Sequence, residues 1–154
     1  MNDNKIFILS GPIQSGKSTR LMEWAMKEKN VKGIITPIVG NNRMFYNIDK
    51  KQFFAMESAA KEIDTLKIGK YFFSQYAFRK AEKIIEDGAL NNEGWLVIDE
   101  IGPLELKGEG FNTVLKKILP IENKKFNLLL VIRESILEDI LKYFEIKKFC
   151  EMKI

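Results

Sequence analysis

The sequence predicts an α/β fold of three layers, in which helices cover both faces of a mostly parallel β-sheet. Three observations lead to this prediction. Apolar segments at residues 5–10, 95–98 and 127–132 have the length and composition of buried strands, and segments with helical periodicity separate them. Strands that alternate with helices form parallel sheets, because each helix packs back across the sheet. Short strands interrupted by polar residues at about 41–73 predict antiparallel hairpin strands added to this sheet.

The N-terminal part predicts a strand, a loop, a helix and a second strand. Residues 5–10 are apolar and partly β-branched, and this run stops at Gly11. Residues 17–29 predict a helix, whose face at helical spacing consists of Leu21, Trp24, Ala25 and Glu28. Residues 33–39 return to strand character, and Pro37 places this strand at a sheet edge or at a bulge.

The next segment predicts a small antiparallel insertion. Strands at residues 43–48 and 52–56 are bounded by the polar runs 41–42 and 49–51, which predict turns. Residues 66–73 predict a further strand or strand pair.

Three amphipathic helices and a last strand complete the chain. The second of these helices ends at Pro120, and Ser135 with Glu138 predicts a capping box at the start of the third. Residues 146–152 predict the last strand. The apolar faces of the three helices are Ala77, Ala81, Ile84 and Ile85; Phe111, Val114, Leu115, Ile118 and Leu119; and Ile136, Leu137, Ile140, Leu141 and Phe144.

Length and composition limit the possible functions. The 154 residues suit one domain over 1–154, with the hairpin insertion at about 41–73. The net charge of +4 comes from scattered lysines and indicates no nucleic-acid partner. Without histidine, histidine-based catalysis and histidine metal sites are excluded, and the single Cys150 fits a cytoplasmic protein. No apolar run approaches the roughly 18 residues of a membrane span, so we expect no membrane partner.

The segment GPIQSGKS, residues 11–18, has the pattern of a phosphate-binding loop. Gly11 and Gly16 allow the backbone to turn its N–H groups toward an anion, and the following helix adds partial positive charge at its N-terminus. Lys17 is predicted to reach the β and γ phosphates and to assist catalysis, and the Ser18 hydroxyl is predicted to bind Mg²⁺. The motif lies between a predicted strand and a predicted helix, as this chemistry requires.

A second candidate motif is WLVIDE, in which a buried strand runs into Asp99 and Glu100. Ligands of open α/β sheets bind at the carboxyl ends of the strands. Asp99 is therefore predicted to hold Mg²⁺ through water, and Glu100 to act as the general base on a water beside the γ-phosphate. The alternative is that both residues belong to a solvated turn.

The sequence resembles the THEP1-type nucleoside-triphosphatases over most of residues 5–119. The resemblance rests on the phosphate loop, on VIDEIGPLEL with Phe111 after it, and on IGKYFFSQYAFRKAEKIIEDGAL before it. It implies a RecA-like P-loop NTPase sheet and slow, Mg²⁺-dependent hydrolysis of several nucleoside triphosphates. It also implies a set of phosphate-binding residues, namely Gly11, Pro12, Ile13, Gln14, Ser15, Gly16, Lys17, Ser18 and Thr19. This family usually has an arginine- and glycine-rich stretch after the second strand, where this chain has Arg43 as the only arginine.

Two further groups of residues are candidates with open alternatives. Arg133 follows the strand 127–132, and in a RecA-like order it lies near the γ-phosphate as a catalytic residue; alternatively it forms an ion pair with Glu134 or Glu138. Aromatic side chains could stack on a base or belong to the core, and the candidates are Tyr46, Tyr71 and Phe72.

Hydrolysis of nucleoside triphosphates (ATP, GTP, CTP and UTP), with Mg²⁺ and broad base specificity, is the predicted function. A small-molecule or nucleotide kinase is the first alternative, although only four arginines are present and none forms a lid segment. A partner-gated nucleotide switch is the second, and the sequence identifies no protein partner.

Overall fold

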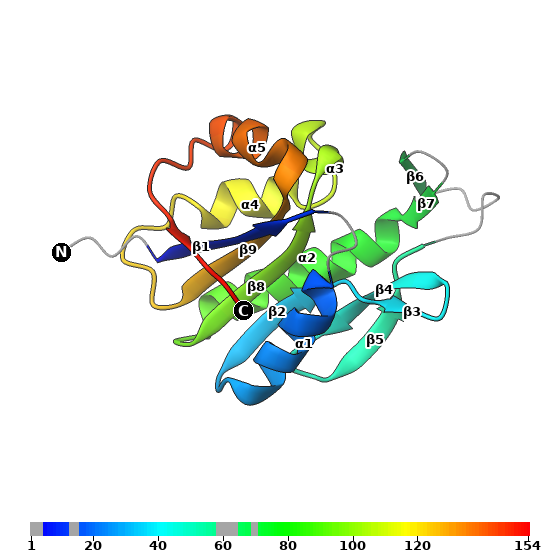
Figure 1. Ribbon diagram of the computed structural model, residues 1–154, viewed down its shortest axis with the longest axis horizontal. Helices are drawn as coiled ribbons and strands as arrows, with labels where there is room; N and C mark the ends of the chain where they lie inside the picture. The colour runs from blue at the N-terminus through cyan, green and yellow to red at the C-terminus, as the bar shows by residue number, and fades with distance from the viewer. Residues whose placement is uncertain (1–4, 13–15, 58–64, 69–70) are drawn as a thin grey trace.

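The chain folds into a central β-sheet with helices on both of its faces (Figure 1). The computed structural model describes residues 5–12, 16–57, 65–68 and 71–154. The strands are β1 (Ile6–Gly11), β2 (Val31–Ile35), β3 (Ile38–Val39), β4 (Asn42–Asn47), β5 (Gln52–Ala55), β6 (Thr65–Ile68), β7 (Tyr71–Ser74), β8 (Trp95–Ile101), β9 (Asn127–Arg133) and β10 (Cys150–Glu151). The helices are α1 (Lys17–Lys27), α2 (Gln75–Leu90), α3 (Pro103–Leu106), α4 (Asn112–Ile118), α5 (Leu137–Tyr143) and the 3₁₀ turn η1 (Glu134–Ile136).

The central sheet is mostly parallel. Its strands follow the order β10-β1-β9-β8-β2-β4-β3, and β5 pairs with β4. The strands β10, β1, β9, β8 and β2 pair in parallel, whereas β4 is antiparallel to β2, β3 and β5. The strands β6 and β7 form a separate antiparallel pair beside the N-terminal end of α2 (Figure 1). The predicted three-layer α/β fold with added antiparallel hairpin strands is thus confirmed.

Two hydrophobic clusters fill the spaces between the layers. On one face, α2, α4 and α5 cover the sheet, and Ile8, Ile98 and Leu130 point into that layer. On the other face, Leu21 of α1 packs against alternate residues of the same strands. Successive strand residues point to opposite faces, so fully apolar strands such as β9 supply both clusters.

The carboxyl ends of β1, β9 and β8 lie at one edge of the sheet, where α1 begins. Gly11 at the end of β1 is paired in register with Arg133 at the end of β9. Ile101 at the end of β8 is paired with Ile132 of β9. This edge brings together the phosphate-loop strand β1, the acidic strand β8 and β9, which lies between them.

The predicted strand at 33–39 is broken into two. β2 ends at Ile35 and lies inside the sheet between β8 and β4, while β3 begins at Ile38 on the sheet edge. Pro37 lies between them and has no N–H to donate to a neighbouring strand, while its carbonyl accepts a hydrogen bond from the Met44 backbone N–H at 2.9 Å. The proline thus separates an interior strand from an edge strand, so the prediction of one continuous strand over residues 33–39 was wrong, while the part after Pro37 does lie at the sheet edge.

Other local predictions also need correction. Ser135 lies in the 3₁₀ turn η1, and α5 begins at Leu137 without a side-chain cap, so the predicted capping box is wrong. The last strand covers only Cys150–Glu151. The helix α3 was not predicted, and β8 continues past Ile98 to Ile101.

None of the helices in the described residues is long and apolar enough to cross a membrane. The assignment of residues 1–154 to one domain stays a prediction.

Candidate active site

The phosphate loop begins where β1 ends. Gly16 closes the loop with a left-handed backbone (φ 80°) that favours glycine, and its carbonyl accepts a 3.1 Å hydrogen bond from the Arg20 backbone N–H in the first turn of α1. The described part of the predicted phosphate-binding set is Gly11, Pro12 and residues 16–19, whereas Ile13, Gln14 and Ser15 lie outside the described residues.

The Lys17 ammonium group contacts the first residues of this loop. Its Nζ donates to the carbonyl oxygens of Gly11 at 3.1 Å and of Pro12 at 2.6 Å. Both carbonyls belong to the start of the loop, so the described contacts tie the cation to the loop backbone, and its role toward phosphates stays a prediction. Ser18 and Thr19 follow on the first turn of α1 and line a cleft beside the loop.

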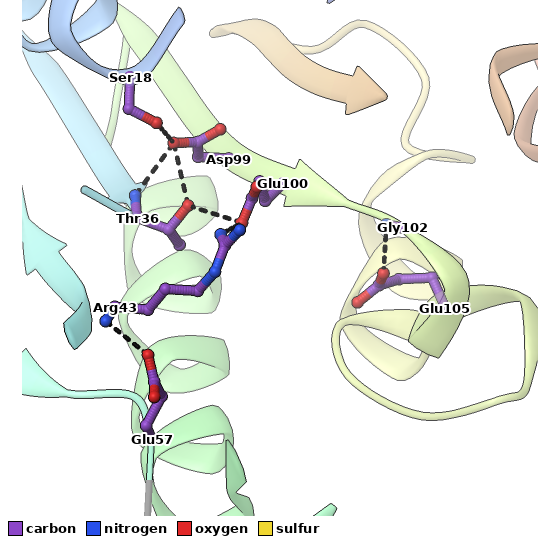
Figure 2. A network of polar contacts seen from close by, with 8 residues as sticks. All are labelled: Ser18, Thr36, Arg43, Glu57, Asp99, Glu100, Gly102 and Glu105. Atoms are coloured by element: carbon purple, nitrogen blue, oxygen red, sulfur yellow. Dashed lines mark hydrogen bonds and ion pairs between the residues drawn. The ribbon is translucent and has the colours of Figure 1, made fainter. Parts of the chain in front are cut away.

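Asp99 and Glu100 lie at a bulge in β8. Two residues of β9, Leu130 and Ile132, are paired with Ile98 and Ile101, so β8 has one residue more than its partner here. Glu100 also has a positive φ of 58°, which is uncommon for a residue with a side chain. A regular strand would send two consecutive side chains to opposite faces, whereas a bulge redirects one of them. As a result, both carboxylates face the same cleft (Figure 2).

The carboxylate of Asp99 is almost fully buried and tightly held. Its Oδ2 accepts hydrogen bonds from the Thr36 backbone N–H at 3.0 Å, the Thr36 hydroxyl at 3.1 Å and the Ser18 hydroxyl at 3.3 Å. Burial, with the negative charge of Glu100 as a second cause, raises the pKa of Asp99 to about 6, although these hydrogen bonds lower it in part. Ser18 and Asp99, the two predicted Mg²⁺ residues, are therefore in direct contact.

Glu100 is more exposed than Asp99 and has two donors beside it. Its Oε2 forms an ion pair with Nη1 of Arg43 and lies 3.4 Å from the Thr36 hydroxyl (Figure 2). The Thr36 hydroxyl lies between the two carboxylates, but it carries one hydrogen and can donate to only one of them at a time.

These residues line one cleft of about 610 Å³. It is bounded by the loop and α1 on one side, by the ends of β8 and β9 at the base, and by β3 and β4 on the other side. Its lining side chains include Lys17, Ser18, Met22, Met26, Thr36, Ile38, Arg43, Glu57, Asp99, Glu100 and Arg133. The predicted site residues that the structure describes thus converge on the edge where the phosphate loop and acidic strand meet.

Arg133 reaches this cleft from the end of β9. Among the described residues it forms no ion pair with Glu134 or Glu138, the alternative partners that the sequence offered. Its position beside the loop is compatible with a role toward phosphate, and that role stays a prediction.

Sequence reasoning missed Thr36, Arg43 and Glu57. Thr36 follows β2 and belongs to no recognisable motif. Arg43 and Glu57 reach the site only through strand pairing in the hairpin insertion. Thr36 could have been identified as a site residue by one signal: it is a polar residue directly after a strand, and that strand lies beside the acidic strand.

The aromatic candidates for base stacking have different outcomes. Tyr46 packs against Phe53, with ring centroids 4.6 Å apart, and borders the hydrophobic cluster under α1. It does not line the cleft, so for this residue the core alternative holds. Tyr71 and Phe72 lie on β7, which the structure describes as a backbone strand only.

The oxygen donors at this edge fit a hard divalent cation. A serine hydroxyl and a carboxylate are ligands that Mg²⁺ prefers, and Mg²⁺ in nucleotide sites takes its remaining ligands from phosphates and water. Within the described residues there is no cluster of three acidic, histidine or cysteine side chains that could hold a metal alone. The residues present thus fit a metal bound together with a triphosphate.

A glycine-rich loop with lysine and serine between a strand and a helix, beside a carboxylate on a nearby strand, defines the class of P-loop nucleoside-triphosphate-binding proteins. Within this class, a family model described as NTPase matches residues 6–153, so the chain belongs to this THEP1-like family and is a nucleoside-triphosphatase. A comparison with curated protein sequences finds no match.

Two solved structures share the fold. One is THEP1 from the hyperthermophile Aquifex aeolicus, with a TM-score of 0.73 and 17% sequence identity, covering 96% of this chain and 88% of that one. The other is a human cancer-related nucleoside triphosphatase, with a TM-score of 0.66 and 17% identity, covering 97% of this chain and 89% of that one.

Proposed function

We propose that this nucleoside-triphosphatase uses Mg²⁺, accepts several bases, and cleaves the bond to the γ-phosphate slowly, with Glu100 as the general base. The observation that carries this proposal is the convergence of Lys17, Ser18, Asp99 and Glu100 on one cleft. A protein that only held nucleotide would need the carboxylate of Asp99 more than that of Glu100.

The roles follow from the chemistry of each group. The backbone of the loop and Lys17 bind the β and γ phosphates, and Arg133 stabilises charge that develops on the γ-phosphate. Ser18 and Asp99 would hold Mg²⁺, which neutralises phosphate charge when it is bound. Glu100 takes a proton from the attacking water, so that the water oxygen forms a bond to the γ-phosphorus and the bond to the bridging oxygen breaks.

Broad base specificity is supported by a missing motif. The sequence contains no Asn-Lys-x-Asp segment, which is the segment that reads guanine in many P-loop proteins. We therefore expect rates for ATP, GTP, CTP and UTP to agree within about a hundredfold, near the upper end of discrimination by a single group.

Phosphate release from these four nucleotides, with and without Mg²⁺, tests the proposal. We expect release from all four with Mg²⁺ and none above background with excess EDTA. Equal rates with EDTA would disprove the metal dependence, and a preference above a hundredfold would disprove the broad specificity. Release that appears only after addition of a cell extract, and that exceeds the release by the extract alone, would favour the partner-gated switch.

A further inference from the structure

Arg43 connects the hairpin insertion to the predicted general base. It lies near the start of β4, which belongs to the antiparallel hairpin strands, whereas Glu100 lies on β8. Its guanidinium points toward β8 and forms an ion pair with Oε2 of Glu100 (Figure 2). The two side chains are about a quarter and a third exposed, so the contact lies at the cleft wall and not on the open surface.

The two carboxylate oxygens of Glu100 have different surroundings. Within the described residues, both neighbouring donors, Arg43 and Thr36, approach Oε2, and Oε1 accepts no hydrogen bond. One oxygen is therefore anchored to the protein and the other remains able to accept a proton from water. This arrangement suits a general base, which must be held in place by the protein and still have a lone pair that can accept a proton from water.

Arg43 is the stronger of the two anchors. The single hydrogen of the Thr36 hydroxyl is shared with Asp99, which lies closer at 3.1 Å than Glu100 at 3.4 Å. A guanidinium is always charged and presents several N–H groups in a fixed plane, so its hydrogen bond to a carboxylate is both strong and directional.

Arg43 is itself fixed in place. Its backbone N–H donates to Oε2 of Glu57 at 2.6 Å, and in the β3–β4 strand pair Arg43 lies opposite Ile38. Glu57 also lines the cleft, after the end of β5. Because the backbone of Arg43 is anchored on both sides, its side chain starts from a fixed position beside Glu100.

We propose that Arg43 is a positioning residue for hydrolysis, which orients Glu100 through Oε2 and makes the β3–β4 hairpin part of the active site. This inference rests on the proposed role of Glu100 as general base. A partly exposed ion pair contributes little to stability. We therefore assign to this ion pair the role of orienting the Glu100 carboxylate. Loss of this orientation should lower turnover without lowering nucleotide affinity.

A double-mutant cycle between Arg43→Ala and Glu100→Gln tests the inference. Single-turnover phosphate release is measured for the wild type, both single variants and the double variant, with ATP affinity from calorimetry and thermal melting as a check of folding. We expect Arg43→Ala to slow release roughly 10- to 100-fold, because a misplacement of about 1 Å can lower a rate by as much as about 10²-fold. ATP affinity should change less than about threefold, and in the Glu100→Gln background Arg43→Ala should have no further effect.

Two further variants sharpen the experiment. Arg43→Lys keeps the positive charge but not the planar fork, so we expect a rate between those of wild type and Arg43→Ala. Arg79→Ala removes an exposed arginine on α2, which does not line the cleft, and should release phosphate like the wild type.

The outcomes separate this inference from the function on which it rests. An equal loss from Arg43→Ala in both backgrounds would mean that Arg43 acts on the phosphates directly and would overturn the inference. An unchanged rate in Arg43→Ala, with Glu100→Gln slow, would overturn it while leaving Glu100 as the base. An unchanged rate in Glu100→Gln would overturn the proposed role of Glu100, and the inference with it.

Discussion

Asp99 accepts two hydrogen bonds from Thr36 on the same carboxylate oxygen. The Thr36 backbone N–H donates to Oδ2 at 3.0 Å, and the Thr36 hydroxyl donates to it at 3.1 Å. The Ser18 hydroxyl also donates to Oδ2. Within the described residues, the other oxygen of Asp99, Oδ1, accepts no hydrogen bond. Thr36 therefore orients the buried carboxylate and leaves one oxygen for a ligand in the cleft.

Thr36→Val should weaken metal-dependent nucleotide binding. Valine keeps the shape of the side chain and the backbone hydrogen bond, but it removes the hydroxyl donor beside Asp99. A hydrogen bond to a charged group contributes about 1.5–3 kcal/mol to stability, and because only the part that orients Asp99 for the metal affects binding, we expect the affinity for ATP with Mg²⁺ to fall by up to roughly 10-fold. Calorimetric titration with Mg²⁺ and with EDTA measures this effect. Thr36→Ser should bind like the wild type, and equal affinity in Thr36→Val would show that the hydroxyl is dispensable.

Arg133→Ala should slow turnover more than it weakens binding. Arg133 ends β9 in register with Gly11, where the phosphate loop begins, and it lines the cleft. A contact made mainly in the transition state lowers kcat and kcat/KM together. Steady-state kinetics on Arg133→Ala and Arg133→Lys provide the measurement. A rise in KM alone would make Arg133 a ground-state ligand, and no change would place it outside the chemistry.

Glu105 should make the protein less stable as the pH rises from about 4.5 to 7. This carboxyl lies in α3, is almost fully buried, and accepts hydrogen bonds from the backbone N–H groups of Gly102 at 2.6 Å and Phe111 at 2.9 Å. Figure 2 shows it beyond Gly102, apart from the cluster around Asp99. Burial raises the pKa of Glu105 from its usual 4.5 to about 7, despite these hydrogen bonds.

The sign of the effect follows from proton binding. Between pH 4.5 and 7 the folded protein keeps the Glu105 proton and the unfolded chain loses it, so the free energy of unfolding falls with rising pH by at most about 3 kcal/mol. Urea denaturation at pH 5 and pH 8 measures this fall. Glu105→Gln should reduce it, while substitution of the exposed Glu93 by Gln should not. An identical pH dependence in Glu105→Gln would contradict the shift.

The sequence predicted the parts of the site that come from local patterns. The phosphate loop, the apolar strands and the acidic pair are each contained in a few consecutive residues, so periodicity and spacing identify them. The capping box failed because a serine followed three residues later by glutamate also fits a 3₁₀ turn, as at Ser135. The capping interaction instead occurs at Glu105, whose partner Gly102 has no side chain and so gives no sequence signal.

The rest of the site depends on contacts between distant segments. The bulge at Asp99 and Glu100 is visible only from the register of β8 against β9. Arg43 meets Glu100 because β4 pairs with β2, which in turn pairs with β8. A local pattern specifies that β4 is a strand, but its neighbour in the sheet is decided by packing of the whole fold.

Glu100→Gln should separate binding from chemistry. Glutamine keeps the size of the side chain and can still accept a hydrogen bond from Arg43, but it cannot take a proton from water. We expect ATP affinity with Mg²⁺ to stay near the wild-type value, while the single-turnover rate falls roughly 10²- to 10⁴-fold, the usual contribution of a positioned general base. The wild-type rate is measured first, because slow turnover limits the range over which a loss can be seen.

Asp99→Asn is the matched comparison, because it changes the neighbouring carboxylate in the same way. Asp99 is buried and contacts Ser18, so its loss should impair both metal-dependent binding and turnover. Glu100 is the more exposed residue, and its left-handed backbone turns the side chain toward the cleft, so its loss should impair turnover alone. If Glu100→Gln instead released phosphate at the wild-type rate with wild-type affinity, the strained backbone at position 100 would have to serve the ion pair with Arg43, and the base would have to be sought elsewhere in the cleft.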